Sequence, residues 1–511
     1  MTDKKSDKKN LLGLTNKKEE NFSEWYSELV IKSELIEYSE ISGCYVLRPW
    51  AYEIWEIIQS HLNIQFKKLG ISNAYFPMFV TEKTLSKEQE HLEGFTPEVA
   101  WVTHSGDTKL DNKLAIRPTS ETIIYPYFSK WIRTYRDLPL KINQWCNVVR
   151  WEFKDPTPFI RSREFLWHEA HTAHETLEET KQFVEDSLDV YYQTYKKLLG
   201  IPTIKGVKTS VEKFAGADYT STVEAYIQES GKGIQGATSH NLGQNFAKMF
   251  GIEYEGKDSK KHIPFQTSFG FTTRSIGVMI MTHGDNKGLV LPPNIAPIQI
   301  VIVPIYSKKY ENSLIDDYTN KIHMYLKEKF RVKLDDDMAN TAGYKFNYWE
   351  LKGVPLRIEI GGQEAESNKL SLFYRNNCKK ETVDINLLDK KEEENIFVKL
   401  INDKLNEIQE QMFLKAESKL NSNITECLCM DEFIEDIKQG KLVMTPFCDD
   451  SKVEEEVKSK CKELYGISGI KTLCKPYLDN SNFNSNKNNN FGKCFASSNT
   501  ATCCVLWGKS Y

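Results

Sequence analysis

The stretch VRWEFKDPTPFIRSR, residues 149–163, decides how the rest of the chain is interpreted. Two prolines, Pro156 and Pro158, remove backbone donors and fix φ, so the stretch predicts a loop between paired strands and not a helix. Such a hairpin brings Arg150 and Arg161 close together. Guanidinium groups bind phosphate and carboxylate oxygens in a planar, bidentate way. The stretch therefore predicts either an anion-binding hairpin or a surface loop with ordinary salt bridges.

Length and composition limit the possible classes of protein. A chain of 511 residues is long enough for about three domains. Its formal net charge of -4 argues against a generally basic nucleic-acid coat, so any nucleic-acid site must be a local patch. The sequence has no apolar N-terminal signal and no apolar run of roughly eighteen residues or more, which predicts neither secretion nor a membrane span. The odd number of cysteines, 11, indicates reduced thiols and a cytoplasmic location.

Two pairs of polar residues occupy positions where a side chain can serve either structure or chemistry. Thr119 and Glu121 follow a short strand and precede an expected helix, from Thr122 to Trp131. They fit an N-cap with a first-turn acid, and they equally fit a hydroxyl and a carboxylate that receive the N–H groups of a small cation. Glu169 and His171 lie two residues apart on an expected strand and so share one face.

Further along, three segments suggest strands and helices around a ligand. Residues 175–199 have the spacing of a long amphipathic helix. The glycine-rich segment 230–240 carries Gln235, Thr238 and His240, but it lacks a phosphate-loop ending, so on its own it is a weak signal. Residues 268–277 read as a strand that leads into a helix.

Composition divides the chain into four parts. Residues 1–20 are rich in lysine and predict a flexible tail. The first expected domain covers 21–295, because prolines at 292, 293 and 297 mark a boundary. Residues 296–400 form an expected α/β unit, which opens with an apolar run, 298–305, suited to a parallel strand. Residues 401–511 form a last, cysteine-rich domain.

Several separated motifs resemble those of class II aminoacyl-tRNA synthetases, and among them the prolyl-tRNA synthetases of the eukaryotic and archaeal type. The resemblance rests on Arg150-Trp-Glu152 with the loop that ends at Arg161, Gly270 to Arg274, Arg117 to Glu121, Arg163 to His171, and Trp507 to Tyr511. It implies an α+β catalytic domain with an antiparallel sheet, an α/β anticodon-binding domain and a small α+β C-terminal domain. It also implies a homodimer formed around Tyr75 to Phe79, in which Pro77 lies at an inter-subunit edge.

The resemblance implies a proline-tRNA ligase, which activates L-proline with ATP and Mg²⁺ and transfers it to tRNA(Pro). The residues implied in catalysis are Arg150, Arg161 and Arg274. Those implied in ATP binding are Arg150, Glu152, Arg161, Phe165, Gln235, Thr238, Thr272 and Arg274, with Phe165 and Arg274 on either side of the adenine. Those implied in proline binding are Thr119, Glu121, Arg150, Trp167, Glu169, His171, Phe214, His240 and Ser268.

The chain departs from the family pattern in three places. Ser268-Phe269-Gly270 stands where the family has Ser-Trp-Gly. Basic residues expected on the anticodon-reading face are replaced at Asp337 and around Gln363, which leaves as candidate tRNA contacts Lys345, Trp349, Lys352 and Arg357. The family's zinc site keeps only Cys448 and Cys494, since Val453 and Ala496 replace their partners. A structural zinc ion needs four ligands, so no bound zinc is expected here.

Two alternative functions stay open at this point. A synthetase for threonine is nearest in architecture, but that specificity implies a zinc site in the catalytic domain, and Cys146 is the only cysteine between residues 119 and 275. A non-catalytic tRNA-binding paralogue predicts broken ATP-binding arginines, yet Arg150, Arg161 and Arg274 are all present.

Overall fold

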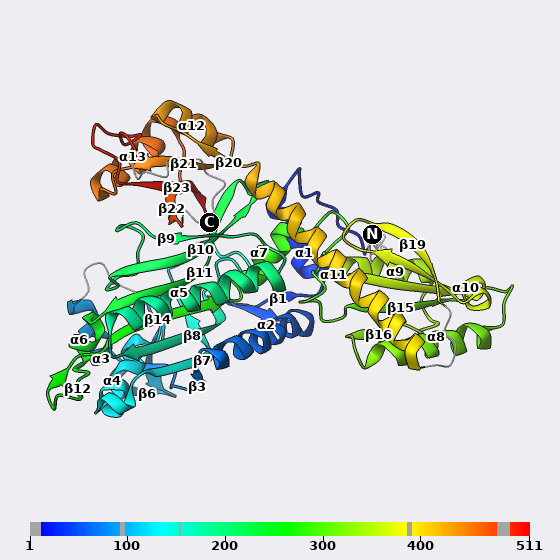
Figure 1. Ribbon diagram of the computed structural model, residues 1–511, viewed down its shortest axis with the longest axis horizontal. Coiled ribbons are helices and arrows are strands. Elements are labelled where there is room, and N and C mark those ends of the chain that lie inside the picture. The colour runs from blue at the N-terminus through cyan, green and yellow to red at the C-terminus, as the bar shows by residue number, and fades with distance from the viewer. Residues whose placement is uncertain (1–11, 92–97, 153–154, 386–390, 478–490) are drawn as a thin grey trace, which may run out of the picture.

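The computed structural model describes residues 12–91, 98–152, 155–385, 391–477 and 491–511 (Figure 1). A large, mostly antiparallel sheet forms the centre, a five-stranded sheet lies to one side, and the C-terminal strands extend the central sheet. The predicted fold class, an α+β catalytic domain followed by an α/β unit and an α+β C-terminal region, is confirmed.

The predicted hairpin lies near one edge of the catalytic sheet, where only β3 follows it. Strands β7 (Leu140–Val149) and β8 (Glu164–His174) pair antiparallel, and Val149 lies opposite Glu164 at the start of the connecting loop. The sheet continues through antiparallel pairs to β14 (Phe265–Thr272), β11 (Lys232–Gly243), β10 (Tyr219–Ile227) and β9 (Ile204–Val207), while β3 (Ser72–Asn73) pairs parallel to β7 at the other side.

Helices cover the face of this sheet that is turned away from the site. Helix α5 (Leu177–Gln193) begins at a capping box made by Thr176 and Glu179, and it ends in a π-turn (Thr194–Leu198). It buries Phe183, Val184, Leu188 and Tyr191. The predicted helix at 175–199 is thus confirmed in position. Helices α2 (Pro49–Lys68) and α7 (Arg274–His283) complete this layer (Figure 1).

Other elements of the catalytic part flank the sheet. Helix α4 (Glu121–Trp131) agrees with the predicted helix. The remaining elements are α1 (Phe22–Lys32), β1 (Ile36–Tyr38), β2 (Tyr45–Leu47), β4 (Phe79–Thr81), α3 (Glu82–His91), β5 (Trp101–Ser105), β6 (Thr108–Ile116), α6 (Asn245–Phe250), β12 (Tyr254–Glu255) and β13 (Lys261–His262).

The second sheet has the strand order β16-β15-β17-β18-β19. Strand β15 (Ile300–Ile305), the second in this order, lies parallel to both neighbours, as the apolar run predicts. The bounds of the other elements are β16 (Val332–Leu334), β17 (Leu356–Gly361), β18 (Lys369–Tyr374), β19 (Lys379–Asp384), α8 (Asn312–Lys327), α9 (Ala342–Leu351) and α10 (Gly362–Ser367).

The C-terminal region is joined to the catalytic sheet by backbone pairing. Helix α11 (Lys391–Asn421) runs from the second sheet toward it (Figure 1). Strand β22 (Ile470–Pro476) pairs with β9, and β23 (Cys503–Ser510) pairs with β21, β22 and β11. One sheet of 11 strands results. The other elements are β20 (Ile424–Glu426), α12 (Met430–Lys438), β21 (Leu442–Phe447) and α13 (Ser451–Tyr465).

The N-terminal segment is partly packed on the catalytic domain. The backbone N–H groups of Thr15 and Asn16 donate to the Glu28 carboxylate at 2.9 Å. Lys18 is 5% exposed, and its Nζ donates to the carbonyl of Gly284 at 3.0 Å. Residues 12–20 therefore differ from the expected flexible tail, because their polar groups are satisfied by the folded chain. The rest of that expected tail, residues 1–11, lies outside the described residues.

None of the helices in the described part of the chain is long and apolar enough to cross a membrane.

Candidate active site

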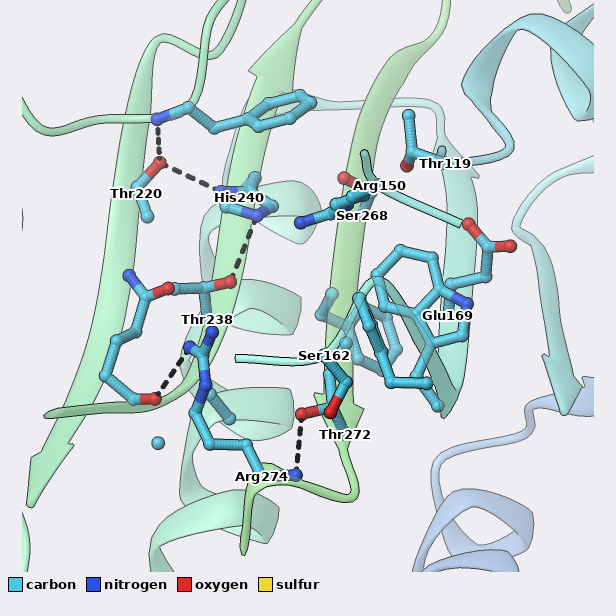
Figure 2. Close-up of a pocket in the computed structure, with 18 of the residues that line it drawn as sticks. Thr119, Arg150, Ser162, Glu169, Thr220, Thr238, His240, Ser268, Thr272 and Arg274 are labelled. Atoms are coloured by element: carbon cyan, nitrogen blue, oxygen red, sulfur yellow. Dashed lines mark hydrogen bonds between the residues drawn. The ribbon is translucent and has the colours of Figure 1, made fainter. Parts of the chain in front are cut away.

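A cavity of about 270 Å³ opens over the centre of the catalytic sheet. Its walls come from the loop before α4, the β7–β8 hairpin, β10, β11 and β14 (Figure 2). Side chains predicted for proline and for ATP line this one cavity. They are Thr119, Glu121, Arg150, Phe165, Trp167, Glu169, Phe214, Gln235, Thr238, His240, Ser268, Thr272 and Arg274.

Glu169 provides a fixed negative charge at one end of the cavity. Its carboxylate accepts hydrogen bonds from the backbone N–H and the hydroxyl of Ser120, and from Nε2 of Gln144 at 2.7 Å. Burial opposes ionisation, but hydrogen bonds from His171, Ser120 and Gln144 outweigh it and lower the pKa of Glu169. The group is therefore a carboxylate at neutral pH.

Thr119 and Glu121 lie beside Glu169, where the strand gives way to α4. The Thr119 hydroxyl donates to Oε2 of Glu121 at 2.5 Å, and both side chains are buried. A buried arginine holds this turn: Arg117 Nη1 donates to the Phe76 carbonyl at 2.8 Å and Nε donates to the Asn147 carbonyl at 2.9 Å. Two acids and a hydroxyl thus converge where a small cation can bind.

The opposite wall of this end is aromatic and uncharged. His240 lies between two hydroxyls, with Nδ1 2.9 Å from Thr220 Oγ1 and Nε2 3.1 Å from Thr238 Oγ1 (Figure 2). Burial lowers the pKa of His240 to about 3, so the imidazole is neutral. The Phe214 ring lies against it, with 4.6 Å between ring centroids. This wall suits a compact apolar group.

Ser268 adds an unsatisfied hydroxyl to the same end. It is 4% exposed and lines the cavity. Its Oγ has no hydrogen-bond partner among the residues that the structure describes. A buried polar atom without a partner is costly, so this hydroxyl is available to a ligand. Trp167 stands nearby, and its Nε1 donates to the Sγ of Cys146 at 3.2 Å.

Basic and aromatic groups define the other end. The Arg274 Nε donates to the Ile160 carbonyl at 3.2 Å, and Nη1 donates to the Gln235 carbonyl at 3.3 Å. Arg274 and Thr272 lie at the end of the cavity away from Thr119 (Figure 2). Arg150 lies between the two ends: its Nε donates to the Pro118 carbonyl at 3.0 Å, and its guanidinium lies 5.5 Å from the Phe165 ring.

Three predicted residues lie outside the cavity. His171 lies behind Glu169, with Nε2 3.3 Å from Oε2 of Glu169 and Nδ1 3.0 Å from the Tyr125 hydroxyl, so it contacts the cavity only through the carboxylate. Glu152 is exposed beside the loop. Arg161 lines a neighbouring cavity.

Sequence reasoning missed several residues of the site. Ser120 and Gln144 hold Glu169, and Thr220 holds His240. Ser162 and Glu212 also line the cavity. Only Ser120 carried a signal, because it lies between two residues already singled out. The glycines of segment 230–240 approach protein groups as well: a Cβ on Gly236 would meet the Tyr195 ring at 2.9 Å.

The four candidate tRNA contacts are buried and bonded to the protein itself. Lys345 Nζ donates to the Asp335 carbonyl at 2.8 Å, and Trp349 Nε1 donates to its carboxylate at 2.7 Å. Lys352 Nζ lies 2.8 Å from Glu34. Arg357 pairs with Glu350 and Glu359. Each is less than a tenth exposed, so the position of these residues argues against direct contact with RNA, and the expectation is corrected accordingly.

The cysteines of the expected zinc remnant do not gather a ligand set. The Sγ of Cys448 lies 3.9 Å from the Ser497 hydroxyl. Hydrogen bonds from Ser497 and neighbouring backbone N–H groups outweigh burial and lower the pKa of Cys494. No group of three or more His, Cys, Asp or Glu side chains suited to a metal was found in the described ranges. The donor set therefore does not fit a tetrahedral zinc.

Comparison with known proteins agrees with this geometry. The family model for the tRNA synthetase class II core domain (G, H, P, S and T) matches residues 101–283, that for an anticodon binding domain matches 299–394, and that for the prolyl-tRNA synthetase C-terminal region matches 430–511. The fold and the cavity thus define a class II aminoacyl-tRNA synthetase.

Full-length relatives narrow the family further. The chain is 47% identical to a protein of Arabidopsis thaliana named cytoplasmic proline–tRNA ligase, over 98% of this chain and 91% of that protein. It resembles the crystal structure of Cryptosporidium parvum prolyl-tRNA synthetase with halofuginone and AMPPNP, with a TM-score of 0.91 and 47% identity over 98% of this chain and 100% of the other. The same enzyme with L-proline and AMP gives a TM-score of 0.90 and 45% identity, over 98% and 97% of the two chains. The chain belongs to the prolyl-tRNA synthetase family.

Proposed function

We propose that this protein is a proline–tRNA ligase, which forms prolyl-adenylate from L-proline and ATP and transfers the prolyl group to the 3′ end of tRNA(Pro). One observation carries the proposal: a single cavity joins a cation-receiving end, built by Thr119, Glu121 and Glu169, to an end built by Thr272 and Arg274, and Arg150 also lines it. The related Cryptosporidium parvum enzyme, which was crystallised in complex with L-proline and AMP, supports the same pair of ligands.

Proline would bind at the end with Glu121 and Glu169. Its secondary ammonium group has two N–H donors, which match the Thr119 hydroxyl and the carboxylate of Glu121. The ring would lie against Trp167, Phe214 and His240, and Ser268 offers its unpaired hydroxyl. Alanine and cysteine are small enough to enter such a pocket, so exclusion there is incomplete.

ATP would occupy the remainder of the cavity. Arg150 would bridge the proline carboxylate and the α-phosphate; this is supported by its contacts with the Pro118 carbonyl, next to Thr119, and with the Phe165 ring. Phe165 and Arg274 would hold the adenine between a ring face and a guanidinium plane. Gln235, Thr238 and Thr272 line the same cavity and would contact the ribose and the phosphates. A bound Mg²⁺ would neutralise phosphate charge; the chain itself supplies position and fixed positive charge.

Both chemical steps then follow from position and charge. In the first step, a proline carboxylate oxygen bonds to the α-phosphorus of ATP. The bond from that phosphorus to the oxygen between the α- and β-phosphates breaks, and pyrophosphate leaves with the electron pair. In the second, a hydroxyl oxygen of the terminal tRNA ribose bonds to the prolyl carbonyl carbon, the bond between that carbon and the phosphate oxygen breaks, and AMP leaves with the electron pair while the hydroxyl proton is released. Arg150 stabilises the charge that develops on the α-phosphate in the first step.

The other parts of the chain fit the same function. We assign residues 21–295 to catalysis, 296–400 to anticodon binding and 401–511 to the C-terminal domain, which the matched family ranges support. A homodimer is supported by an exposed aromatic patch: Tyr75 is 75% and Phe79 47% exposed. The name of the Arabidopsis thaliana relative supports a cytoplasmic location.

Amino-acid-dependent pyrophosphate exchange tests the proposal. Purified protein with ATP, Mg²⁺ and labelled pyrophosphate should form labelled ATP when proline is present. Threonine in place of proline tests the nearest alternative specificity. If neither proline nor threonine supports exchange, the protein is better explained as a non-catalytic paralogue. Charging of tRNA(Pro) transcripts then tests the second step.

A further inference from the structure

A second cavity of about 270 Å³ lies beside the first, between the catalytic sheet and the C-terminal strands. The two cavities share Ile160, Glu212, Gln235 and Arg274. The second is closed on its far side by β22 and by the last residues of the chain, among them Lys471, Ser510 and Tyr511. It therefore continues the arginine-lined end of the first cavity toward the C-terminal domain.

A buried ion pair forms one wall. Lys208 is 7% exposed, its Nζ lies 2.6 Å from Oε1 of Glu224, and the same ammonium donates to the Leu473 carbonyl at 2.7 Å. Glu224 stands opposite Gln235 in the β10–β11 ladder. Its second oxygen, Oε2, has no hydrogen-bond partner in the described part of the chain. Glu224 uses one oxygen to hold the lysine at the cavity wall.

The C-terminal domain contributes an accessible cation. Lys471 lies on β22, and its Nζ is 3.0 Å from Oε2 of Glu212. The side chain is 47% exposed, so its ammonium retains access to solvent and to a ligand. Glu212 also pairs with Lys458 at 3.0 Å, which fixes the carboxylate from a second direction.

The cavity as a whole favours an anion. Four basic side chains line it: Arg161, Lys208, Arg274 and Lys471. The acidic side chains there are Glu212 and Glu224, so the positive side chains outnumber the negative ones. Groups that carry several phosphate oxygens are the natural ligands of such a cluster.

We propose that this cavity receives the pyrophosphate leaving group and that Lys471 of the C-terminal domain binds it. The inference rests on the proposed function, since pyrophosphate is the product of adenylate formation. Breakage of the α–β phosphoanhydride bond leaves pyrophosphate with an added negative charge next to Arg274 and Gln235, which already border both cavities. Lys471 then acts as a product-binding residue contributed from outside the catalytic domain.

A phosphate of the tRNA acceptor end has the same chemistry and could reach the cavity from outside. Pyrophosphate is favoured because the cavity opens from the nucleotide end, at residues that both cavities share. The two sources differ in an assay, since pyrophosphate exchange needs no tRNA. The Michaelis constant for pyrophosphate and that for tRNA can therefore be measured separately on the same variant.

The test is Lys471→Gln in the full-length protein. In the exchange reaction at saturating ATP and proline, the KM for pyrophosphate should rise about fivefold, as expected when one partly screened charged contact is lost. The KM for proline should stay unchanged, and Lys471→Arg should retain the KM for pyrophosphate. Lys475→Gln is the matched control, because Lys475 lies on the same strand, pairs with Asp449 at 2.9 Å and is not among the residues lining the cavity.

Each outcome bears on one inference. Absence of proline-dependent exchange in the unmodified protein would refute the proposed function itself. Normal exchange together with an unchanged KM for pyrophosphate in Lys471→Gln would overturn the pyrophosphate assignment alone. A raised KM for tRNA with an unchanged KM for pyrophosphate would also overturn it, and would assign the cation to the tRNA backbone. Lys471→Ala gives the same comparison if the glutamine variant does not fold.

Discussion

Ser120 holds both carboxylate oxygens of Glu169: its backbone N–H donates to Oε2 at 3.1 Å and its hydroxyl donates to Oε1. The two residues are 49 positions apart in the chain. These hydrogen bonds join the N-cap of α4 to strand β8 of the catalytic sheet. Thr119 and Glu121 flank Ser120 in the chain, so their positions depend on the same two hydrogen bonds.

Ser120→Ala should weaken proline binding more than it slows catalysis. The substitution removes one hydrogen bond to a buried carboxylate, an interaction worth about 1.5–3 kcal/mol. We expect the KM for proline to rise roughly tenfold, with a smaller change in kcat. Ser129→Ala on the same helix is the control, since the Ser129 hydroxyl donates only to the Pro126 carbonyl. Equal KM values in the two variants would refute the role of Ser120.

Arg150→Ala should abolish adenylate formation and leave the fold intact. The guanidinium is placed to stabilise charge that develops on the α-phosphate, and loss of such a group costs about 3–4 kcal/mol of transition-state stabilisation. Pyrophosphate exchange measures the effect, and circular dichroism checks the fold. Near-normal exchange in this variant would contradict the assignment.

Mild acid should destabilise the protein through its buried histidines. Burial lowers the pKa of His168 and His240 to about 3 and that of His174 and His283 to about 4. Their unfolded pKa is about 6.5. Between pH 6.5 and 4 the unfolded chain therefore binds protons that the folded chain excludes, and the free energy of unfolding falls as the pH falls. Each histidine contributes about 1.4 kcal/mol per pH unit in this window.

Urea denaturation at pH 6.5, 6.0 and 5.5 measures this proton uptake above the range in which carboxylates titrate. His174→Gln should lower the uptake by about one proton. A pH-independent free energy of unfolding would show that the histidines are protonated in the folded protein.

Substitution of the exposed aromatic patch should break the expected dimer. Phe76 is buried beneath this patch and contacts the rings of Tyr127 and Trp131. Changing Tyr75 and Phe79 together to serine should shift sedimentation toward the monomer mass of 59.2 kDa. Tyr38→Ser, at a side chain 58% exposed elsewhere, serves as the control. A monomeric unmodified protein at micromolar concentration would refute the homodimer.

The C-terminal domain should fold and function without zinc. Its core is built from Phe433, Phe447, Phe495 and Trp507, whose rings contact one another. A strong chelator, with Mg²⁺ replenished, should therefore leave both the Tm and aminoacylation unchanged. Stoichiometric zinc in elemental analysis of the native protein would show that the remaining cysteines bind metal after all.

The sequence predicted the elements that have strong local signals. The apolar run around Ile300–Ile305 and the prolines at 156 and 158 specified a parallel strand and a loop, because each pattern acts within a few residues. The family motifs then placed Glu121 and Glu169 in one cavity. Ser120, Gln144 and Thr220 escaped notice, since their contacts depend on which strands lie side by side.

The four tRNA candidates illustrate the limit of reasoning from residue type. A lysine in an α/β unit suggests an exposed charge, but Lys352 pairs with Glu34, 318 residues away, and is 4% exposed. No pattern near Lys352 indicates that partner. The pairing of β22 with β9 escaped prediction for a similar reason, because it is made by backbone groups that every residue carries.

That pairing has a consequence for anyone seeking a minimal fragment for screening or crystallisation. Strand β9 is paired on one side with β10 and on the other with β22. A Cβ on Gly206 would collide with the Lys475 carbonyl oxygen, so the two backbones are in close contact there. Excision of the C-terminal domain would leave β9 with a row of unpaired N–H and C=O groups, which invite association between copies. The isolated catalytic domain would aggregate along that edge, and fragment boundaries should include β22.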